Sequence, residues 1–251
     1  MILLKKIKLL NKRIVIIPTY NEIENIDLIT KAVFELPAPF DVLIVDDNSP
    51  DGTGNRVKAL QQNYPNLHLL ERKAKNGLGT AYIDGFKWCL AKGYEYIFEM
   101  DADFSHNPSD LIKLYDACEV HKGMTVGSRY VTGVNVVNWP MSRVMLSFFA
   151  SKYVRFITGI DVHDTTAGFV CYHHQVLRTI DLDRIKFRGY AFQIEMKFAA
   201  KKLGFKITEV PIIFTEREVG VSKMNRNIIK EGIIGVLKIQ WHSFFTSYAK
   251  P

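Results

Sequence analysis

Residues 96–106 read YIFEMDADFSH, and this stretch organises the rest of the chain. A β-favouring apolar run ends abruptly at two carboxylates, Asp101 and Asp103. Side chains two residues apart in extended backbone point to the same face, so both carboxylates can converge just beyond the end of a strand. Open α/β sheets bind ligands at that edge, and Mg²⁺ is typically held by one or two carboxylates together with substrate phosphates. The alternative is a turn or helix cap, where Asp is also common.

The residues before this stretch alternate between short apolar runs and segments with helical spacing. β-favouring runs occupy residues 13–18, 41–45 and 67–70, and a helical pattern follows each of them. Four successive strand–helix units predict an α/β fold, a Rossmann-like and mostly parallel sheet with helices on both faces. No Gly-x-Gly-x-x-Gly follows the first strand and the chain contains no P-loop. Both observations count against a dehydrogenase and an NTPase.

Polar loops follow the first, second and fourth predicted strands. They carry Tyr20, Glu22, Asp46, Asp47, Asp101 and Asp103. Tyr20 can stack on a base, and Glu22 with one of the paired aspartates can accept hydrogen bonds from a base or a ribose. Residues 47–52 can instead form only a tight turn and a helix cap. Three acidic loops at one sheet edge favour a nucleotide-binding site.

The second half of the chain breaks the alternation. Residues 141–157 carry apolar side chains around more than a core-facing stripe, and every charge among them is basic. This pattern is typical of an interfacial helix on an anionic membrane, with a well-buried helix as the alternative. Residues 227–247 form a second strongly apolar helix that is too polar to span a bilayer but can lie on one. We expect residues 206–214 to form a strand pair broken at Pro211.

Four further polar side chains in this half are candidates for substrate contacts. Gln193 and Glu195 open a predicted helix and can reach the hydroxyls of a sugar, although an acid is also common at a helix start. Arg217 and Lys223 flank a polar segment and can clamp a diphosphate, the arginine bidentately and the lysine as a point charge.

The composition of the chain limits the kinds of binding partner and cellular setting that we expect. A net charge of +7 and a pI near 9.2 favour a polyanionic partner such as a nucleotide or a phospholipid surface. Basic residues are spread along the chain without a nucleic-acid-binding motif, so we expect no nucleic-acid partner. Three isolated cysteines indicate a reduced, intracellular protein. Lysines interrupt the apolar residues at 1–10, and no long uncharged apolar run occurs, so we expect neither a signal peptide nor a transmembrane helix.

Taken together, the motifs resemble the dolichol-phosphate (polyprenol-phosphate) mannose synthase family of the inverting GT-A glycosyltransferases of family 2. The resemblance covers roughly residues 13–224 in the right order. The matching stretches are PTYNE at 18–22, VDDNSPDG at 45–52, GLGTAY at 77–82, MDADFSH at 100–106, GSRY at 127–130, NWPMSR at 138–143, FQIEM at 192–196 and REVGVSK at 217–223.

The resemblance implies roles by position. The nucleoside would be held by Pro18, Tyr20, Glu22, Val45 and Asp47. The nucleotide and a Mg²⁺ or Mn²⁺ ion would be held by Asp101, Ala102 and Asp103, with Asp101 and Asp103 as the metal ligands. The donor or acceptor phosphates would be contacted by Arg129, Arg217 and Lys223. Catalysis would rest on Asp101, Asp103, Arg129 and Arg217. Some relatives have Gln where Ser105 stands, so water or Ser105 would complete the metal site.

The resemblance also implies an activity and a setting. The expected reaction transfers mannose from GDP-mannose to a dolichyl or polyprenyl phosphate with inversion. Residues 1–224 would form the GT-A domain, with a nucleotide-sugar half at about 13–130 and an acceptor half at about 131–224, and residues 225–251 a peripheral amphipathic helix. The protein would sit peripherally on the cytoplasmic face of a membrane, with or without a separate anchor subunit. The alternatives are another donor such as UDP-glucose, a glycan acceptor, or a non-catalytic nucleotide- or nucleic-acid-binding subunit.

Overall fold

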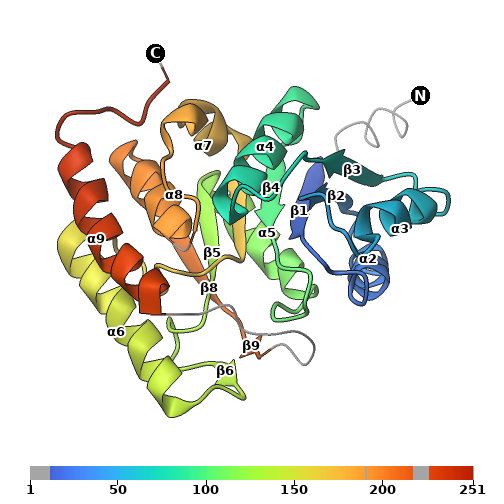
Figure 1. Ribbon diagram of the computed structural model, residues 1–251. Coiled ribbons are helices and arrows are strands. Elements are labelled where there is room, and N and C mark those ends of the chain that lie inside the picture. The colour runs from blue at the N-terminus through green and yellow to red at the C-terminus, as the bar shows by residue number, and fades with distance from the viewer. Residues whose placement is uncertain (1–11, 190, 217–225, 251) are drawn as a thin grey trace.

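The computed structural model describes residues 12–189, 191–216 and 226–250 (Figure 1). The strands are β1 (Arg13–Thr19), β2 (Asp41–Asp46), β3 (Leu67–Glu71), β4 (Tyr96–Glu99), β5 (Met124–Ser128), β6 (Val136–Val137), β7 (Val170–His173), β8 (Ile207–Pro211) and β9 (Phe214–Thr215). The helices are α2 (Ile26–Phe34), α3 (Thr53–Leu60), α4 (Leu78–Ala91), α5 (Asp110–His121), α6 (Met141–Thr158), α7 (His174–Thr179), α8 (Ala191–Lys202) and α9 (Arg226–His242), with a 3₁₀ turn at Leu182–Arg184.

The central sheet has seven strands in the order β3-β2-β1-β4-β7-β5-β8. Strands β1 to β4 pair in parallel, as the alternating pattern predicts. Strand β7 lies antiparallel between β4 and β5, which the sequence pattern did not reveal. The carboxyl ends of β1, β2 and β4 therefore meet at one edge, and the loops that follow them carry the acidic side chains.

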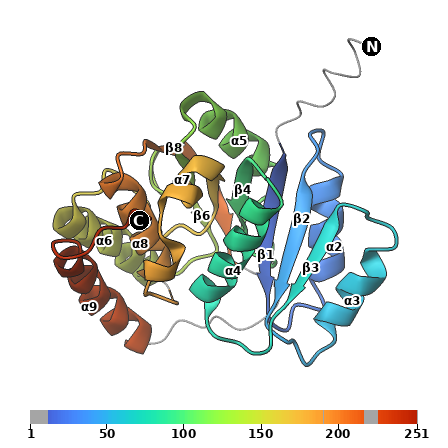
Figure 2. The ribbon, with the colours of Figure 1, turned by 90° about the horizontal axis from the view of Figure 1, so that it is seen from above.

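Helices cover both faces of the sheet (Figures 1 and 2). Successive side chains of β1 point to opposite faces. Ile14 and Ile16 join the core cluster under α4, α7 and α8, while Val15 and Ile17 join the cluster under α2, α3 and α5. Because both faces are buried, the strands read as continuous apolar runs rather than alternating ones.

Two strands separated after Pro211 are present, as expected for residues 206–214, but they do not pair with each other. Strand β8 ends at Pro211 and pairs in parallel with β5. Strand β9 begins at Phe214 and pairs in parallel with β6 in a separate two-stranded sheet. The last backbone contact of this strand with β5 is the hydrogen bond from the Ile212 amide to the Ser128 carbonyl at 3.1 Å, after which the chain leaves the central sheet. The small sheet thereby lies next to the acidic loop, where the amide of Thr215 donates to the carbonyl of Ser105 at 3.3 Å.

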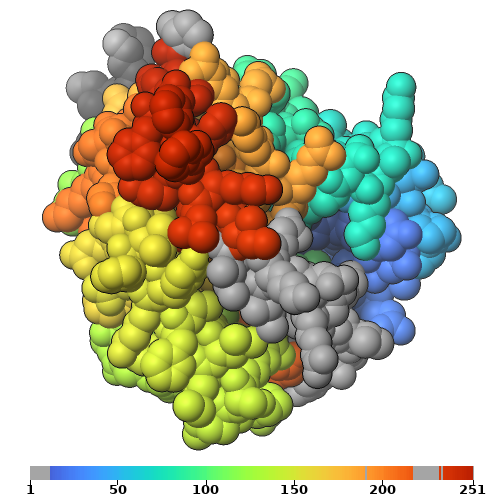
Figure 3. Space-filling model, turned by 60° about the vertical axis from the view of Figure 1, so that its left-hand side comes forward, coloured from blue at the N-terminus to red at the C-terminus, as the bar shows by residue number. Residues whose placement is uncertain are grey.

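The C-terminal helix α9 packs against α8 and α6, and α6 and α9 lie side by side (Figures 1 and 3). Val236 and Ile239 of α9 are buried in the core cluster under α8. The tail beyond α9 returns to the domain, where the hydroxyl of Tyr248 donates to Glu195. Within the described part of the chain, no helix combines the length and apolarity needed to cross a bilayer.

The Gly77-Leu78-Gly79 turn permits close packing of α4 against α8. A Cβ at Gly79 would lie 2.7 Å from the Phe192 ring and 2.8 Å from the carbonyl oxygen of Phe187. We expect Gly79→Ala to lower the free energy of unfolding by about 1–3 kcal/mol, the usual range for overpacking. Chemical denaturation measures this, with Gly232→Ala as the control, because a Cβ there meets nothing within 4 Å. Equal stability of the two variants would contradict the packing argument.

Candidate active site

Three loops leave the same edge of the sheet, and each turns through a residue in the left-handed region. Asn21 follows β1, Asn48 follows β2 and Phe104 follows β4, with φ angles of 60°, 58° and 58°. Asparagine tolerates this conformation, whereas a bulky residue such as phenylalanine adopts it only where the surroundings enforce it. The turn at Phe104 therefore stores backbone strain directly beside Asp103. Strain of this kind is common at functional sites.

The acid pair is fixed by its own loop. Asp103 accepts a hydrogen bond from the amide of Ser105 at 3.1 Å. The amide of Asp101 donates to Nδ1 of His106 at 3.4 Å. The His106 ring stacks on Phe169 at 4.8 Å and meets Phe214 edge-on at 5.4 Å. Burial lowers the pKa of His106 to about 4, so the ring is neutral at pH 7 and can accept that hydrogen bond.

The donor set at this loop fits a hard divalent cation. The Asp101 side chain is 41 % exposed, so a ligand can reach it from solvent. Ala102 and Ser105 are buried in the loop. No cluster of three or more His, Cys, Asp or Glu side chains suited to a metal occurs among the described residues. Two carboxylates with substrate phosphates completing the coordination are the usual arrangement for Mg²⁺. The buried Ser105 makes a bound water the simpler further ligand.

The two aspartates after β2 have different surroundings. Asp46 accepts hydrogen bonds from the Thr19 hydroxyl at 2.9 Å and from the Ser49 amide and hydroxyl at 2.9 and 2.6 Å. It therefore shapes the turn at the end of β2, a role that the turn interpretation of residues 47–52 did not include. Asp47 forms an ion pair with Arg72 at 2.5 Å. Burial raises the pKa of Asp47, although the charge and hydrogen bond of Arg72 offset part of that effect. Contact of Asp47 with a nucleoside stays a prediction.

Arg72, one residue beyond β3, connects Asp47 to the start of α4. Besides Asp47, its guanidinium contacts the Thr80 hydroxyl at 2.6 Å and Asp84 at 2.9 Å. A hollow of about 460 Å³ lies beside it, between residues 70–76 and α4. Sequence reasoning missed Arg72, because its partner Asp47 lies 25 residues away in the chain.

Substitution of Arg72 tests whether Asp47 needs this support. We expect Arg72→Ala to raise the KM for the nucleotide donor about tenfold with little change in kcat, because the Asp47 carboxylate loses a charge-assisted partner. Steady-state kinetics against the donor measures this. Arg56→Ala is the control, since Arg56 pairs with Asp27 at an exposed position. An unchanged donor KM would show that Asp47 does not depend on Arg72.

The other predicted nucleoside contacts surround this edge. Lys75 lies 3.8 Å from the centre of the Tyr20 ring, and the Asn25 side chain donates to Glu22 at 2.9 Å. Pro18 and Val45 are paired in the β1–β2 ladder. The Val45 side chain is entirely buried in the core, so only its main chain can meet a ligand. Stacking of a base on Tyr20 stays a prediction.

Arg129 directly follows β5, lies beside the acid loop and is only 8 % exposed. Its Nε donates to Asp164 at 2.6 Å, and its Nη2 donates to the other carboxylate oxygen of Asp164 at 2.6 Å. The guanidinium also lies 5.5 Å from the Phe214 ring, which contacts His106. Arg129 is therefore near the acid pair and is held by a buried carboxylate. Contact with a substrate phosphate stays a prediction.

Gln193 and Glu195 are buried rather than open to a sugar. Glu195 accepts hydrogen bonds from the amides of Lys186 and Phe187 at 2.9 and 3.0 Å and from Tyr248. Gln193 donates to Glu99 at 2.6 Å, directly behind the acid loop. Both side chains thus support the fold around the site in this structure. Arg217 and Lys223 lie outside the described residues.

Comparison with known sequences identifies the family. A sequence profile of glycosyl transferase family 2 matches residues 14–181. The chain belongs to glycosyl transferase family 2. It is 46% identical over 226 residues to polyprenol monophosphomannose synthase of Mycolicibacterium smegmatis, covering 90% of this chain and 85% of that protein. It is also 46% identical over 223 residues to undecaprenyl-phosphate mannosyltransferase of Micrococcus luteus. That match covers 89% of this chain and 91% of that protein.

Solved structures of other glycosyltransferases share the fold. Glucosyl-3-phosphoglycerate synthase from Mycobacterium tuberculosis, solved with Mn²⁺, UDP and glucosyl-3-phosphoglycerate, superposes with a TM-score of 0.66 at 14% identity, over 94% of this chain and 82% of that one. A mannosyltransferase from Pyrobaculum calidifontis, solved with GDP-Man and Mn²⁺, superposes with a TM-score of 0.59 at 19% identity. The match covers 96% of this chain and 66% of that one. The family 2 chain described here therefore has the GT-A fold, as its motifs predict.

Proposed function

We propose that this enzyme transfers mannose from GDP-mannose to a polyprenyl or dolichyl phosphate, with inversion at the anomeric carbon. The products are a polyprenyl β-D-mannosyl phosphate and GDP. The observation that carries the proposal is the 46% identity, over about nine tenths of the chain, to two enzymes named for mannosyl transfer to polyprenol or undecaprenyl phosphate. The acid pair at the carboxyl end of β4 supplies the matching chemistry.

The chemistry of the acceptor decides which kinds of catalytic assistance the reaction needs from the protein. A lipid phosphate is already an anion at neutral pH, so its oxygen needs little help from a general base. The enzyme must instead bring together two negatively charged substrates and stabilise the departing GDP. We infer that Asp101 and Asp103 hold a divalent cation, which would act as a Lewis acid on the leaving diphosphate. The neighbouring Pyrobaculum structure, which contains GDP-Man and Mn²⁺, supports a nucleotide-sugar donor and a metal of this kind.

Cationic side chains would offset the remaining repulsion. We assign this role to Arg129 beside the acid loop, and to Arg217 and Lys223 in the segment that follows β9. Positive charge fixed near developing negative charge stabilises a transition state strongly in a site that excludes water. Asp47 would accept an N–H of the base, since a carboxylate is an acceptor only.

The exposed faces of α6 and α9 suit a peripheral attachment to a membrane. Large apolar side chains are exposed on both helices, and the two helices form one continuous surface (Figure 3). The exposed residues are Met141, Met145, Leu146, Phe149 and Phe156 on α6, Ile234, Leu237 and Trp241 on α9, and Phe244 and Phe245 just beyond α9. We propose that this surface, called the α6/α9 face, rests on the cytoplasmic face of a membrane that contains the lipid acceptor. A separate anchor subunit would add to this attachment.

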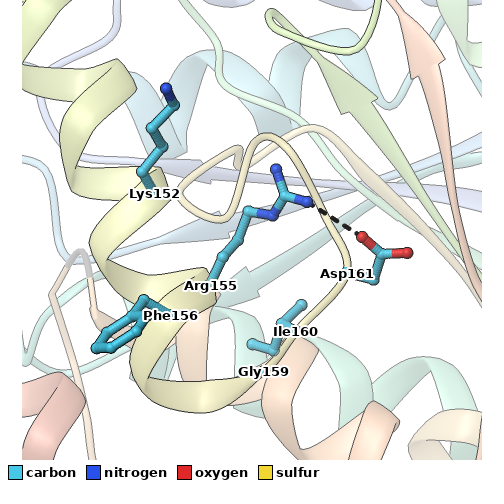
Figure 4. A pocket seen from close by; sticks show the side chains of 6 residues that line it. All are labelled: Lys152, Arg155, Phe156, Gly159, Ile160 and Asp161. Atoms are coloured by element: carbon cyan, nitrogen blue, oxygen red, sulfur yellow. Dashed lines mark hydrogen bonds and ion pairs between the residues drawn. The ribbon is translucent and has the colours of Figure 1, made fainter.

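Basic side chains accompany the apolar ones on α6. A hollow of about 510 Å³ near the end of α6 is lined by Lys152, Arg155 and Phe156 together with residues 159–161 (Figure 4). Arg155 points across it to Asp161 at 3.2 Å. None of these lining residues belongs to the loops that carry the acids, so the hollow is not the transfer site. Its lysine and arginine match the anionic lipids that interfacial helices favour.

Transfer of label into an organic phase tests the proposed function. Purified enzyme, Mg²⁺, labelled GDP-mannose and polyprenyl phosphate are mixed in detergent, and the lipid is extracted into chloroform–methanol. We expect label in the organic phase that disappears with EDTA. Transfer from UDP-glucose but not from GDP-mannose would change the donor. Transfer only to a soluble glycan would exclude the lipid acceptor.

A further inference from the structure

Asp164 lies in the polar turn before β7, and its side chain is completely buried. One carboxylate oxygen accepts the backbone N–H of Arg129 at 3.0 Å and the Nε–H at 2.6 Å. The other oxygen accepts Nη2–H at 2.6 Å. The hydroxyl of Thr166 accepts a further hydrogen bond from Nη2 at 2.9 Å. The turn therefore grips both the main chain and the side chain of Arg129.

The turn is itself anchored, so the main chain at Asp164 is held independently of Arg129. Glu209 of β8 accepts the amide of Asp164 at 3.0 Å and the amide of His163 at 2.8 Å. Lys197 of α8, which is fully buried, donates to the carbonyl of Ala167 at 2.7 Å. Burial by itself would raise the pKa of Asp164, but the charge and hydrogen bonds of Arg129 outweigh it and lower the pKa. Asp164 is therefore a carboxylate anion at neutral pH.

Aromatic rings hold the guanidinium from the other directions. The central carbon of the guanidinium lies 5.3 Å from the ring centres of Tyr130 and Trp139, and 5.5 Å from that of Phe214. Arg129 thus sits in a largely dry setting next to the acid loop. A buried cation is tolerated in such a setting only when an anion compensates it. A carboxylate that accepts two hydrogen bonds also fixes the plane of a guanidinium. Contacts with aromatic rings constrain that plane less.

We propose that Asp164 is a positioning residue for the transfer reaction. It sets the plane and location of the Arg129 guanidinium next to the metal-binding loop before the substrates arrive. The inference rests on the proposed function, because it requires Arg129 to contact a substrate phosphate. Asp164 itself touches no substrate, and its effect passes entirely through Arg129. The same contact keeps the buried arginine ordered in the absence of substrate.

Kinetics of Asp164→Asn, Arg129→Ala and the double variant test this inference. We expect Asp164→Asn, which removes the charge and keeps the shape, to lower kcat/KM about ten- to a hundredfold. In the Arg129→Ala background the same change should cause no further loss, because the two residues act as one unit. Thr165→Val is the matched control: Thr165 is buried in the same turn but bonds Ser151 rather than Arg129. Its activity should stay near that of the wild type.

Chemical rescue separates positioning from a structural role. Added guanidinium should restore part of the activity of Arg129→Ala, whereas methylammonium should not, because only guanidinium matches the two oxygens of Asp164. Rescue should vanish in the double variant. Circular dichroism checks that each variant folds, and Asp164→Glu, which keeps the charge but displaces it, serves if Asp164→Asn does not fold. We expect Asp164→Glu to lower kcat/KM as well.

Three results would overturn the inference in distinguishable ways. Full activity of Arg129→Ala would remove the phosphate role of Arg129 from the proposed function and this inference with it. An inactive Arg129→Ala beside a fully active Asp164→Asn would overturn the inference alone. Multiplicative losses in the double variant, with no rescue by guanidinium in Arg129→Ala, would assign Asp164 to folding only.

Discussion

Asp103→Ala should reduce mannosyl transfer at least a thousandfold while the protein stays folded. The carboxylate directly precedes the strained turn at Phe104 and, with Asp101, forms the acid pair just beyond the end of β4. Under the proposed metal assignment, loss of one of the two carboxylates weakens binding of the cation whose positive charge would offset the departing diphosphate. Electrostatic stabilisation of this kind is usually the largest contribution to catalysis. The organic-phase transfer assay measures the loss, and circular dichroism measures the fold.

Two further measurements tie that loss to the metal. Asp116→Ala is the matched control, because Asp116 is an exposed aspartate on α5 away from the sheet edge. Titration of Mn²⁺ into the enzyme with GDP should show weaker metal binding for Asp103→Ala than for either the wild type or Asp116→Ala. Near-normal turnover of Asp103→Ala would rule out the assignment of the metal site to this loop.

Replacement of four aromatic residues of the α6/α9 face by serine should weaken binding to anionic vesicles about a hundredfold or more. The four residues are Phe149, Phe156, Trp241 and Phe245, whose exposed fractions run from 54% to 86%. Full burial of a large apolar side chain contributes about 1.5–3 kcal/mol. Because each side chain is already partly covered, we expect each to contribute about 0.7 kcal/mol or more to the free energy of vesicle binding. The total of about 2.8 kcal/mol corresponds to a hundredfold change in affinity.

Co-sedimentation with vesicles of anionic phospholipid measures that change. The matched control replaces Leu28 of α2 and Val120 of α5 by serine, since both are exposed but lie on other elements. The four-residue variant should keep its activity on acceptor dispersed in detergent and lose it on acceptor embedded in vesicles. Equal vesicle binding by the variant and the wild type would show that the α6/α9 face is not the membrane-facing surface.

The first half of the fold follows from the sequence because its signals are local. Each strand from β1 to β4 is a short apolar run closed by a polar loop, and each helix between them shows apolar spacing. The position of β7 is different. Its residues, Val170–His173, form a buried run like any other, and only the pairing with β4 and β5 makes the strand antiparallel. Strands β8 and β9 likewise have partners that are distant in sequence.

The same division applies to the candidate site. Asp101 and Asp103 stand out in the sequence because two carboxylates follow an apolar strand at the spacing that aims both at one point. Arg72 and Asp164 do not stand out. Arg72 meets Asp47 across 25 residues, and Asp164 meets Arg129 across 35 residues. Nothing in the local pattern distinguishes them from surface ion pairs, which charged residues form at many positions.

Local patterns in the chain were enough to predict the alternation of strands and helices, the sheet edge at which the acids lie, and the family of the enzyme. These features depend on hydrophobic periodicity and on short motifs, which are properties of neighbouring residues. Only the tertiary structure decided that Asp46 shapes a turn while Asp47 faces Arg72, that Glu195 is buried, and that Asp164 holds Arg129. Those outcomes depend on which distant segments the folded core brings together, because a buried charge is stable only beside the partner that compensates it.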